Sequence, residues 1–383
     1  MYQLNGEFCT DTFLAQHWQK KPMVIREAFS GFIDPVDEHD LAGLAQEEQI
    51  DSRIVSHDNG EWHVSHGPFE DFEDVCKGKW TLLVQAVDRY INDIDALMEA
   101  FRFVPYWRMD DVMISFAVEG AGVGAHTDQY DVFLIQGKGS RRWRVAPPDN
   151  SETHTPHKDL QQVTTFSPTI DVVLQPGDML YIPPGWAHDG VALEDCLTYS
   201  IGFRALTQQD LLQQLADTVA EQTGDKTDSS SRYSDPDLVA QSHPSLVTEK
   251  TSNALKNLFL AFLNSADGED ALLSLLSNQH LAPLEAPEEI TTEELIACLE
   301  EGDSVMRAPG CKPLYSETQN HEQFTFFING EKFAAPKHLM PRLLALFAGE
   351  PLSINTPEAD AGDIALLSLL AILISRGYWE LSN

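Results

Sequence analysis

The chain has 383 residues, of which 43% are hydrophobic and 22% are charged, so its composition is that of a globular protein of about two or three domains. There are 25 Lys and Arg residues against 60 Asp and Glu residues, which gives a net charge of −35. Nucleic-acid-binding proteins normally carry a basic surface, so this charge argues against DNA and favours basic protein partners. Solubility alone would explain the charge equally well.

The five cysteines are scattered and form no CxxC pair, which argues against a disulfide framework and against a zinc knuckle. The N-terminal segment has no positively charged start followed by an apolar run, so we expect no signal peptide. The longest apolar run, Ile364–Ile374, is far shorter than the roughly 20 residues that cross a bilayer. We therefore expect a cytoplasmic protein with no membrane partner.

Residues 1–206 contain many short alternating runs separated by Gly and Pro, among them VMISFAV, YDVFLI, RRWRVA and CLTYSIGF. Alternation with a period of two predicts strands, and many short strands predict a sandwich or a barrel. Two of these runs, Asp131–Gln136 and Arg141–Val145, flank the Gly-Lys-Gly segment 137–139. We expect these two strands to pair as a hairpin.

From residue 207 the pattern becomes helical. Apolar residues at steps of three and four predict three amphipathic helices, at 208–222, 247–263 and 270–279. The polar stretch 223–237 is predicted to be a loop, and residues 281–289 a linker. Extended apolar patches usually mark an interface, so we expect the leucine faces of these helices to form a homodimer.

The C-terminal part combines helices with a two-stranded wing. We predict helices at 292–300, 336–347 and 363–375, and strands at 324–328 and 331–335 around an Asn-Gly turn. Such a winged-helix-like module often binds DNA. The chain from Glu285 onward, however, contains 16 acidic and 6 basic residues, and this negative charge repels phosphate. We expect an α+β protein with domains 1–206, 207–282 and 283–383, the last structural or protein-binding.

A candidate metal site is found in the first domain. His126 and Asp128 are two residues apart, so on a strand their side chains share one face. His188 comes later, after a strand and a Pro-Pro-Gly turn. Two His and one carboxylate with open coordination positions are the ligands of non-haem Fe(II) oxygenases. An isolated His-x-Asp pair is more often structural, and zinc could use the same three ligands.

Alternation also sorts the arginines that follow this pair. Arg141, Trp143 and Val145 share one strand face, whereas Arg142 and Arg144 share the other. An arginine that faces the interior would bind the distal carboxylate of a dicarboxylic acid through two hydrogen bonds, which favours iron with such a cosubstrate over zinc. The alternative is that all three arginines are surface charges.

Ser115 lies on another predicted strand, where it alternates with Asp111 and Met113 on one face. Its hydroxyl could share the carboxylate that the arginine binds. A buried serine that bonds only to the backbone is an equally good interpretation of the spacing.

These segments resemble the JmjC (cupin-like) 2-oxoglutarate oxygenases, and more closely the bacterial ribosomal oxygenases, which hydroxylate an arginine of ribosomal protein L-sixteen. The resemblance runs nearly end to end. It is carried by HWQKKP (17–22), DSRIVSHDNGEWHVSHGPFE (51–70), DDVMISFAV (110–118), GVGAHTDQYDVFLIQGKGSRRWRV (122–145), LQPGDMLYIPPGWAHDG (174–190), YSIGFRA (199–205), YSDPD (233–237) and SRGYW (375–379). It implies an N-terminal double-stranded β-helix, a helical dimerisation segment and a C-terminal winged-helix-like domain.

The resemblance also implies a cofactor and a cosubstrate. It implies that Fe(II) is held by His126, Asp128 and His188, and that Arg141, with Ser115 beside it, binds the distal carboxylate of 2-oxoglutarate. The chain departs from the family at Thr198, where the family usually has an amide.

For a substrate arginine, the residues and the family agree on four side chains. Asp111 would supply a carboxylate partner, Met113 and Tyr130 an apolar wall, and Ser200 a hydrogen bond. Each of these residues could instead be part of the packed core or an ordinary charged residue on the surface. We expect a hydroxylase of the basic ribosomal protein before its assembly, because the acidic chain would attract that protein and repel the phosphate-rich ribosome. The alternatives are a JmjC histidyl hydroxylase or demethylase and a non-catalytic cupin-like binding protein.

Overall fold

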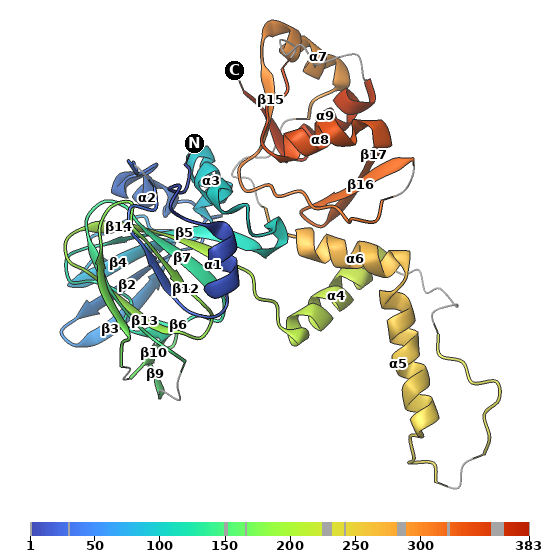
Figure 1. The fold of residues 1–383 in the computed structure, drawn as a ribbon, viewed down its shortest axis with the longest axis horizontal. Coiled ribbons are helices and arrows are strands. Elements are labelled where there is room, and N and C mark those ends of the chain that lie inside the picture. The colour runs from blue at the N-terminus through green and yellow to red at the C-terminus, as the bar shows by residue number, and fades with distance from the viewer. Residues whose placement is uncertain are drawn as a thin grey trace.

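The computed structural model describes residues 2–29, 31–148, 152–164, 167–223, 232–240, 243–281, 289–319, 322–353 and 364–382. Figure 1 shows a β-rich N-terminal part, a set of helices beside it and a C-terminal part of helices and short strands. The α+β fold class that the sequence predicts is confirmed.

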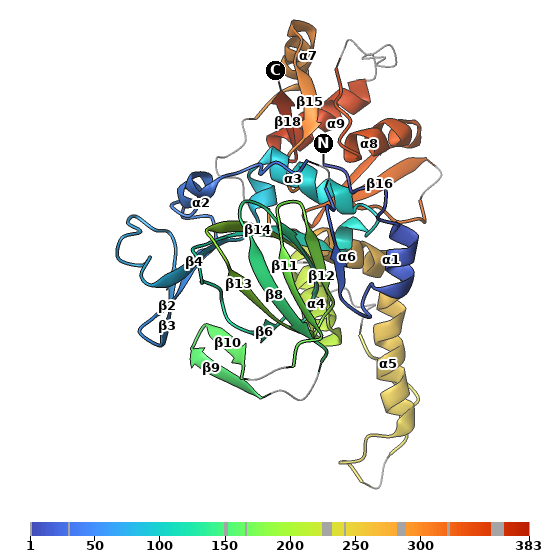
Figure 2. The same ribbon diagram turned by 60° about the vertical axis from the view of Figure 1, so that its left-hand side comes forward.

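Two antiparallel sheets form the N-terminal part. The larger sheet has the strand order β1 (Met23–Ile25), β12 (Met179–Ile182), β7 (Asp131–Gln136), β14 (Cys196–Phe203), β5 (Met109–Ala117), β4 (Lys79–Val84), β2 (Ser52–Asp58) and β3 (Glu61–His66). The smaller sheet has the order β11 (Ile170–Leu174), β8 (Arg141–Ala146), β13 (Ala187–Ala192) and β6 (His126–Thr127). Figure 2 shows the strands of the smaller sheet in front of the larger one. This is the double-stranded β-helix that the resemblance implies.

The predicted hairpin between residues 131–136 and 141–145 is wrong. Strand β7 pairs with β12 and β14, whereas β8 pairs with β11 and β13, so the two strands lie in different sheets. Residues 137–139 carry the chain from one sheet to the other. Gly139 has a φ of +73°, and a Cβ there would lie 2.4 Å from the carbonyl oxygen of Asp195, so this crossing requires a glycine.

In both strands, successive side chains nevertheless point to opposite faces. In β7, Phe133 and Ile135 join the main apolar core, whereas Val132 and Leu134 pack in a second cluster with Trp143. Both faces of β7 are therefore buried, which explains why its sequence is almost continuously apolar.

The remaining elements of this part close the barrel and pack on its outside. They are helices α1 (Thr10–Gln16), α2 (Glu38–Leu44) and α3 (Asn92–Met98), the 3-10 turns Val87–Arg89, Glu99–Phe101 and Tyr106–Arg108, and the hairpin of β9 (Thr153–His157) and β10 (Leu160–Val163). Helix α3 lies between the barrel and the C-terminal part in Figure 1.

The three helices predicted after residue 207 are present as α4 (Gln208–Thr223), α5 (Glu249–Leu263) and α6 (Ala266–Ser277). Helix α6 begins four residues before its predicted start because Ser265 caps it, with its Oγ accepting from the backbone N–H of Gly268 at 3.1 Å. Helix α5 extends away from the rest of the molecule in both views (Figures 1 and 2). Most of the predicted loop 223–237 and linker 281–289 lies outside the described residues.

The C-terminal part contains α7 (Thr292–Glu301), α8 (Met340–Phe347), α9 (Ile364–Ser375), the pair β15 (Ser304–Arg307) and β18 (Trp379–Ser382), and the wing β16 (Gln323–Ile328) and β17 (Glu331–Pro336). Asn329 and Gly330 join the wing strands with φ angles of +46° and +85°, as a tight hairpin turn requires. Residues 337–339 form a 3-10 turn, so α8 starts later than predicted. The β15–β18 pair was not predicted from the sequence, because its strands are too short to show alternation.

A membrane-spanning helix needs a long apolar stretch. Within the described ranges, no helix has the length and apolarity to cross a membrane.

Candidate metal and cosubstrate site

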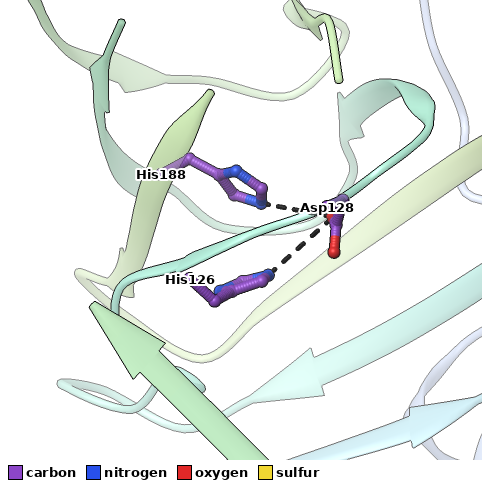
Figure 3. A group of neighbouring side chains, drawn as sticks. All are labelled: His126, Asp128 and His188. Atoms are coloured by element: carbon purple, nitrogen blue, oxygen red, sulfur yellow. Dashed lines mark ion pairs between the residues drawn. The ribbon is translucent and has the colours of Figure 1, made fainter. Parts of the chain in front are cut away.

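The three predicted metal ligands converge at one end of the smaller sheet. Strands β6 and β13 pair so that His126 lies opposite His188, and Asp128 follows β6 directly. One carboxylate oxygen of Asp128 lies 3.9 Å from Nε2 of His126 and 3.5 Å from Nε2 of His188 (Figure 3). One ligand atom from each residue lies within 4.8 Å of the others, which is the spacing that a single metal ion needs.

Backbone carbonyl groups orient both imidazole rings. Nδ1 of His126 lies 2.9 Å from the carbonyl oxygen of Gly124, and Nδ1 of His188 lies 3.0 Å from that of Trp186. Each Nδ1–H can donate to its carbonyl and leave Nε2 with its lone pair directed at the metal position. Burial, with a further contribution from His126, lowers the pKa of His188, so its ring is neutral, as metal coordination requires. The donor set therefore fits Fe(II).

The loop before His126 is braced by strand β10. The side-chain amide of Gln162 donates to the carbonyl of Val123 at 2.8 Å, and the backbone N–H of Val163 donates to that of Ala125 at 2.7 Å. Gly124 has a φ of +81°, and a Cβ there would lie 2.1 Å from the amide nitrogen of Gln162. Sequence reasoning missed Gln162, because β10 comes long after this loop in the chain and nothing in the sequence links the two.

Arg141 is 3% exposed and lies among neutral partners. One terminal nitrogen lies 3.3 Å from the hydroxyl oxygens of both Ser115 and Thr198, and the other donates to the carbonyl of Gly190 at 3.3 Å. The guanidinium carbon lies 5.0 Å from the ring centre of Trp143. Ser115 therefore lies beside Arg141, as the resemblance implies, and Thr198 supplies a second hydroxyl.

The charge of this guanidinium is unbalanced. Burial lowers the pKa of Arg141, and in the described part of the chain no carboxylate pairs with it; its buried Nε also has no hydrogen-bond partner. A buried charge is costly unless it is paired, so this site fits the carboxylate of a ligand such as 2-oxoglutarate. By contrast, Arg142 bonds to Asp171 on the surface at 2.7 and 2.6 Å.

A cavity of about 330 Å³ connects the metal ligands, Arg141 and the predicted substrate residues. Strands β5 and β14 run along it in register, with Ser115 opposite Thr198 and Met113 opposite Ser200. Asp111 lies two residues before Met113 in β5. Ser115, Met113 and Asp111 therefore follow one another along the cavity, from the end that holds Arg141 to the opposite end. The four predicted substrate residues all line this cavity: Asp111, Met113, Tyr130 and Ser200.

Comparison with known proteins decides the family. Residues 96–211 match the JmjC domain family, and residues 231–380 match the ROXA-like winged helix family. Over 372 residues the chain is 41% identical to the ribosomal protein uL16 3-hydroxylase of Escherichia coli, covering 96% of each protein. The chain belongs to the ribosomal oxygenase family. A probable ribosomal oxygenase of Haemophilus influenzae is 33% identical over 336 residues, which cover 84% of this chain and 81% of that protein.

A solved structure extends this comparison to three dimensions. The structure of YcfD, a ribosomal oxygenase from Escherichia coli, in complex with cobalt and 2-oxoglutarate matches 100% of both chains with a TM-score of 0.86 and 38% sequence identity. The relative thus binds cobalt and 2-oxoglutarate within the same fold.

In this ribosomal oxygenase, Asp111 is the most strongly perturbed acid of the cavity. One of its carboxylate oxygens accepts from the backbone N–H of Ala86 at 2.9 Å. Burial raises the pKa of Asp111 to about 7, with added repulsion from Asp88 and Asp110 and a smaller opposing effect of Arg89. This carboxyl group therefore changes its charge near neutral pH.

Other cavity residues differ in their exposure. Tyr130 is 43% exposed and so lies at the mouth, whereas Ser200 is 8% exposed and lies deeper. Two further residues line the cavity with a buried side-chain oxygen that lacks a partner in the described ranges, namely Thr81 and Gln85. Neither residue was predicted from the sequence to have a role.

Proposed function

We propose that this ribosomal oxygenase is an Fe(II)- and 2-oxoglutarate-dependent hydroxylase of an arginine residue in ribosomal protein uL16 (L-sixteen). The observation that carries the proposal is the buried, unpaired charge of Arg141, which opens into the same cavity as a complete set of three metal ligands. The similarity to a uL16 3-hydroxylase over nearly the whole chain supports the choice of substrate.

Each part of the cavity then has a role. His126, Asp128 and His188 would hold Fe(II), which together with 2-oxoglutarate supplies the oxidative chemistry when bound. Arg141 would bind the distal carboxylate of 2-oxoglutarate through two hydrogen bonds, with the hydroxyl of Ser115 beside it. Because Arg141 is buried, little water would reach the pair that it forms with this carboxylate, and the attraction between the two charges would be stronger than in solvent.

The substrate arginine would enter from the mouth. Asp111 would pair with its guanidinium, Met113 and Tyr130 would pack against the side chain, and Ser200 would donate or accept one hydrogen bond. Because Asp111 lies at the end of the cavity away from Arg141, the two charged ends of the site bind two different ligands.

A direct test is incubation of the enzyme with Fe(II), 2-oxoglutarate and an arginine-bearing uL16 fragment without O₂, followed by O₂ and mass analysis. We expect the fragment to gain one oxygen atom on arginine, with one succinate formed for each hydroxylation. Oxygen on histidine or loss of a methyl group would support the histidyl hydroxylase or demethylase alternative. A protein that binds no iron and forms no succinate would support the non-catalytic alternative.

The pKa of Asp111 predicts the pH dependence of substrate binding. Only the ionised carboxylate attracts a guanidinium, so we expect KM for the uL16 fragment to fall as the pH rises through about 7. Asp111→Asn should raise KM and remove this dependence, while Asp110→Asn, which alters a neighbouring exposed acid, should only shift the midpoint downward. A wild-type KM that is constant between about pH 6 and pH 8 would contradict the assignment.

The raised pKa of Asp111 affects the stability of the fold in the opposite direction, because stability falls where substrate binding improves. An aspartate in an unfolded chain has a pKa of about 3.9, so the folded protein holds this proton more strongly. The carboxyl of Asp111 therefore lowers the stability as the pH rises from about 4 to about 7. Asp111→Asn should raise Tm at pH 8 although it weakens substrate binding.

We also propose a homodimer built on the helical segment. Helix α5 has no buried residue, and Leu255, Phe259 and Leu260 are exposed on it. A second copy of the chain would cover this apolar face. We expect the mass of two chains in light scattering at micromolar concentration, and a monomer for Phe259→Asp. Leu193→Asp, at an exposed leucine of the barrel, is the matched control and should stay dimeric.

We also propose that the enzyme acts in the cytoplasm on free uL16 before its assembly, and the net charge of −35 supports the preference for the free protein. An acidic enzyme attracts a basic protein and is repelled by ribosomal phosphate. We expect kcat/KM to fall as salt rises through about 0.1 M, where the Debye length is about 10 Å. Faster hydroxylation of intact ribosomes than of the free protein would contradict this proposal.

For the organisation of the chain, we propose a catalytic domain at 1–206, a helical dimerisation domain at 207–282 and a winged-helix-like domain at 283–383. Separate apolar clusters in the first and last of these ranges support the division.

A further inference from the structure

A buried ion pair connects the winged-helix-like domain to the catalytic domain. Nζ of Lys312, in the segment between β15 and β16, lies 3.1 Å from a carboxylate oxygen of Asp88, in the 3-10 turn Val87–Arg89. The side chain of Lys312 is 3% exposed and that of Asp88 is 0% exposed. Lys and Asp side chains are rarely buried unless they are paired. Each of these two charges therefore depends on the other, because removal of either leaves the other buried and unpaired.

The same turn is bonded to the substrate end of the cavity. The second carboxylate oxygen of Asp88 accepts from the backbone N–H of Val112 at 2.8 Å. Two residues before it, the backbone N–H of Ala86 donates to the carboxylate of Asp111 at 2.9 Å. Residues 86–88 therefore contact Lys312 on one side and both Asp111 and its neighbour in β5 on the other.

We propose that Lys312 is a positioning residue for substrate binding, which acts through Asp88 on the place and charge of Asp111. The winged-helix-like domain then has a role in the reaction, although none of its residues lines the cavity among those described. The inference rests on the proposed function only in taking an arginine as the group that Asp111 receives.

The charges around Asp111 explain why Lys312 matters. Asp88 and Asp110 oppose the ionisation of Asp111, whereas Arg89 and the N–H of Ala86 favour it. From the cavity mouth, Tyr130 and Arg53 also face this region. The ammonium of Lys312 balances the charge of Asp88. Without it, the negative Asp88 would be unpaired beside Asp111, and ionisation of Asp111 would require a higher pH.

Other contacts hold the two domains together when Lys312 is replaced. Arg307 of β15 pairs with Asp95 at 2.8 Å and Glu99 at 2.6 Å, and the backbone N–H of Gly310 donates to Asp95 at 3.0 Å. None of these groups bonds to Asp88. Loss of Lys312 should therefore change the electrostatics of residues 86–88 without separating the domains.

The test compares the wild type with Lys312→Met, Lys312→Arg and the double variant Asp88→Asn with Lys312→Met. For Lys312→Met we expect KM for the uL16 fragment to rise about tenfold at pH 7, a size typical of coupling within one hydrogen-bond network. The pH midpoint of KM should move upward, while KM for 2-oxoglutarate stays unchanged. Lys312→Arg, which keeps the charge, and the double variant, which removes both charges, should restore most of the loss.

Asn92→Ala is the matched control. It removes another contact between the same two domains, the hydrogen bond from Asn92 to Glu380 at 3.2 Å, and it should leave KM and the midpoint unchanged. An equal change in this variant, or a Lys312→Met enzyme with the wild-type KM and midpoint, would overturn the inference. If Lys312→Met fails to fold, Lys312→Arg and the single variant Asp88→Asn decide. Removal of the charge of Asp88 should lower the midpoint and Lys312→Arg should keep it close to that of the wild type, so a midpoint that rises in Asp88→Asn would also overturn the inference.

A second measurement separates this inference from the proposed function. The carboxyl carbon of Asp111 can be titrated by NMR in the substrate-free protein, assigned with Asp111→Asn. We expect its midpoint to be higher in Lys312→Met than in the wild type, whether or not the enzyme acts on arginine. Failure of the wild type to hydroxylate the fragment would refute the proposed function, whereas equal midpoints in the two proteins would refute the inference.

Discussion

Alanine in place of His126 or Asp128 is expected to abolish both hydroxylation and succinate formation. The site offers one ligand atom from each of three residues within 4.8 Å, so either change leaves only two protein ligands. Metal binding and turnover should be lost together, because the metal supplies the oxidative chemistry. Succinate release and calorimetric titration with Fe(II) or Co(II) would measure the two effects.

The fold should survive these changes. The side chains of His126 and Asp128 are 24% and 22% exposed, and neither belongs to an apolar cluster. Gln129→Ala is the matched control, since Gln129 is an exposed residue of the same loop that does not line the cavity. An alanine variant that kept near-normal turnover with one iron bound would show that the ligand assignment is wrong.

Arg141→Ala is expected to raise the 2-oxoglutarate requirement by two or more orders of magnitude. Removing one partner of a buried charge pair costs on the order of 3–5 kcal/mol, which is roughly a hundredfold to several-thousandfold in affinity. Arg141→Lys should recover only part of this, because the ammonium cannot bind a carboxylate through a planar pair of hydrogen bonds. The measurement is KM for 2-oxoglutarate at saturating uL16 fragment.

Arg142→Ala is the control for this prediction. Arg142 is the neighbouring residue on the opposite face of β8, where it pairs with Asp171 in solvent. Its loss should change KM for 2-oxoglutarate by less than about twofold, since exposed ion pairs contribute little. Equal effects of the two substitutions would refute the role of Arg141.

Local patterns in the sequence predicted which side chains share a strand face. Alternation depends only on the extended backbone, so it predicted that Arg141 and Arg142 lie on opposite strand faces without knowledge of the strand partners. The resemblance to the family implied which of the two faces the cosubstrate, and in the structure Arg141 is buried and Arg142 exposed. The same rule applies to Asp111, Met113 and Ser115, which line one cavity. Helical spacing likewise depends only on the local backbone, and it identified α4, α5 and α6, although α6 starts earlier than predicted because Ser265 caps it.

Strand pairing was not predictable in this way. A glycine-rich connection between two strands can form a hairpin or a crossing between sheets, and both leave the alternation of β7 and β8 unchanged. Which one forms depends on the strands that arrive later in the chain, because β12 and β14 take both edges of β7.

The sequence by itself therefore determined three things: which ligand atoms are present, which side chains share a strand face and which segments are helical. These depend on residue types and on the period of the local backbone. Only the tertiary structure decided that Thr198 joins Arg141, that Gln162 braces the loop before His126 and that Lys312 pairs with Asp88. These pairs lie far apart in the chain. Their formation depends on which charges and hydrogen-bond donors must find partners once water is excluded, and no local pattern encodes that choice.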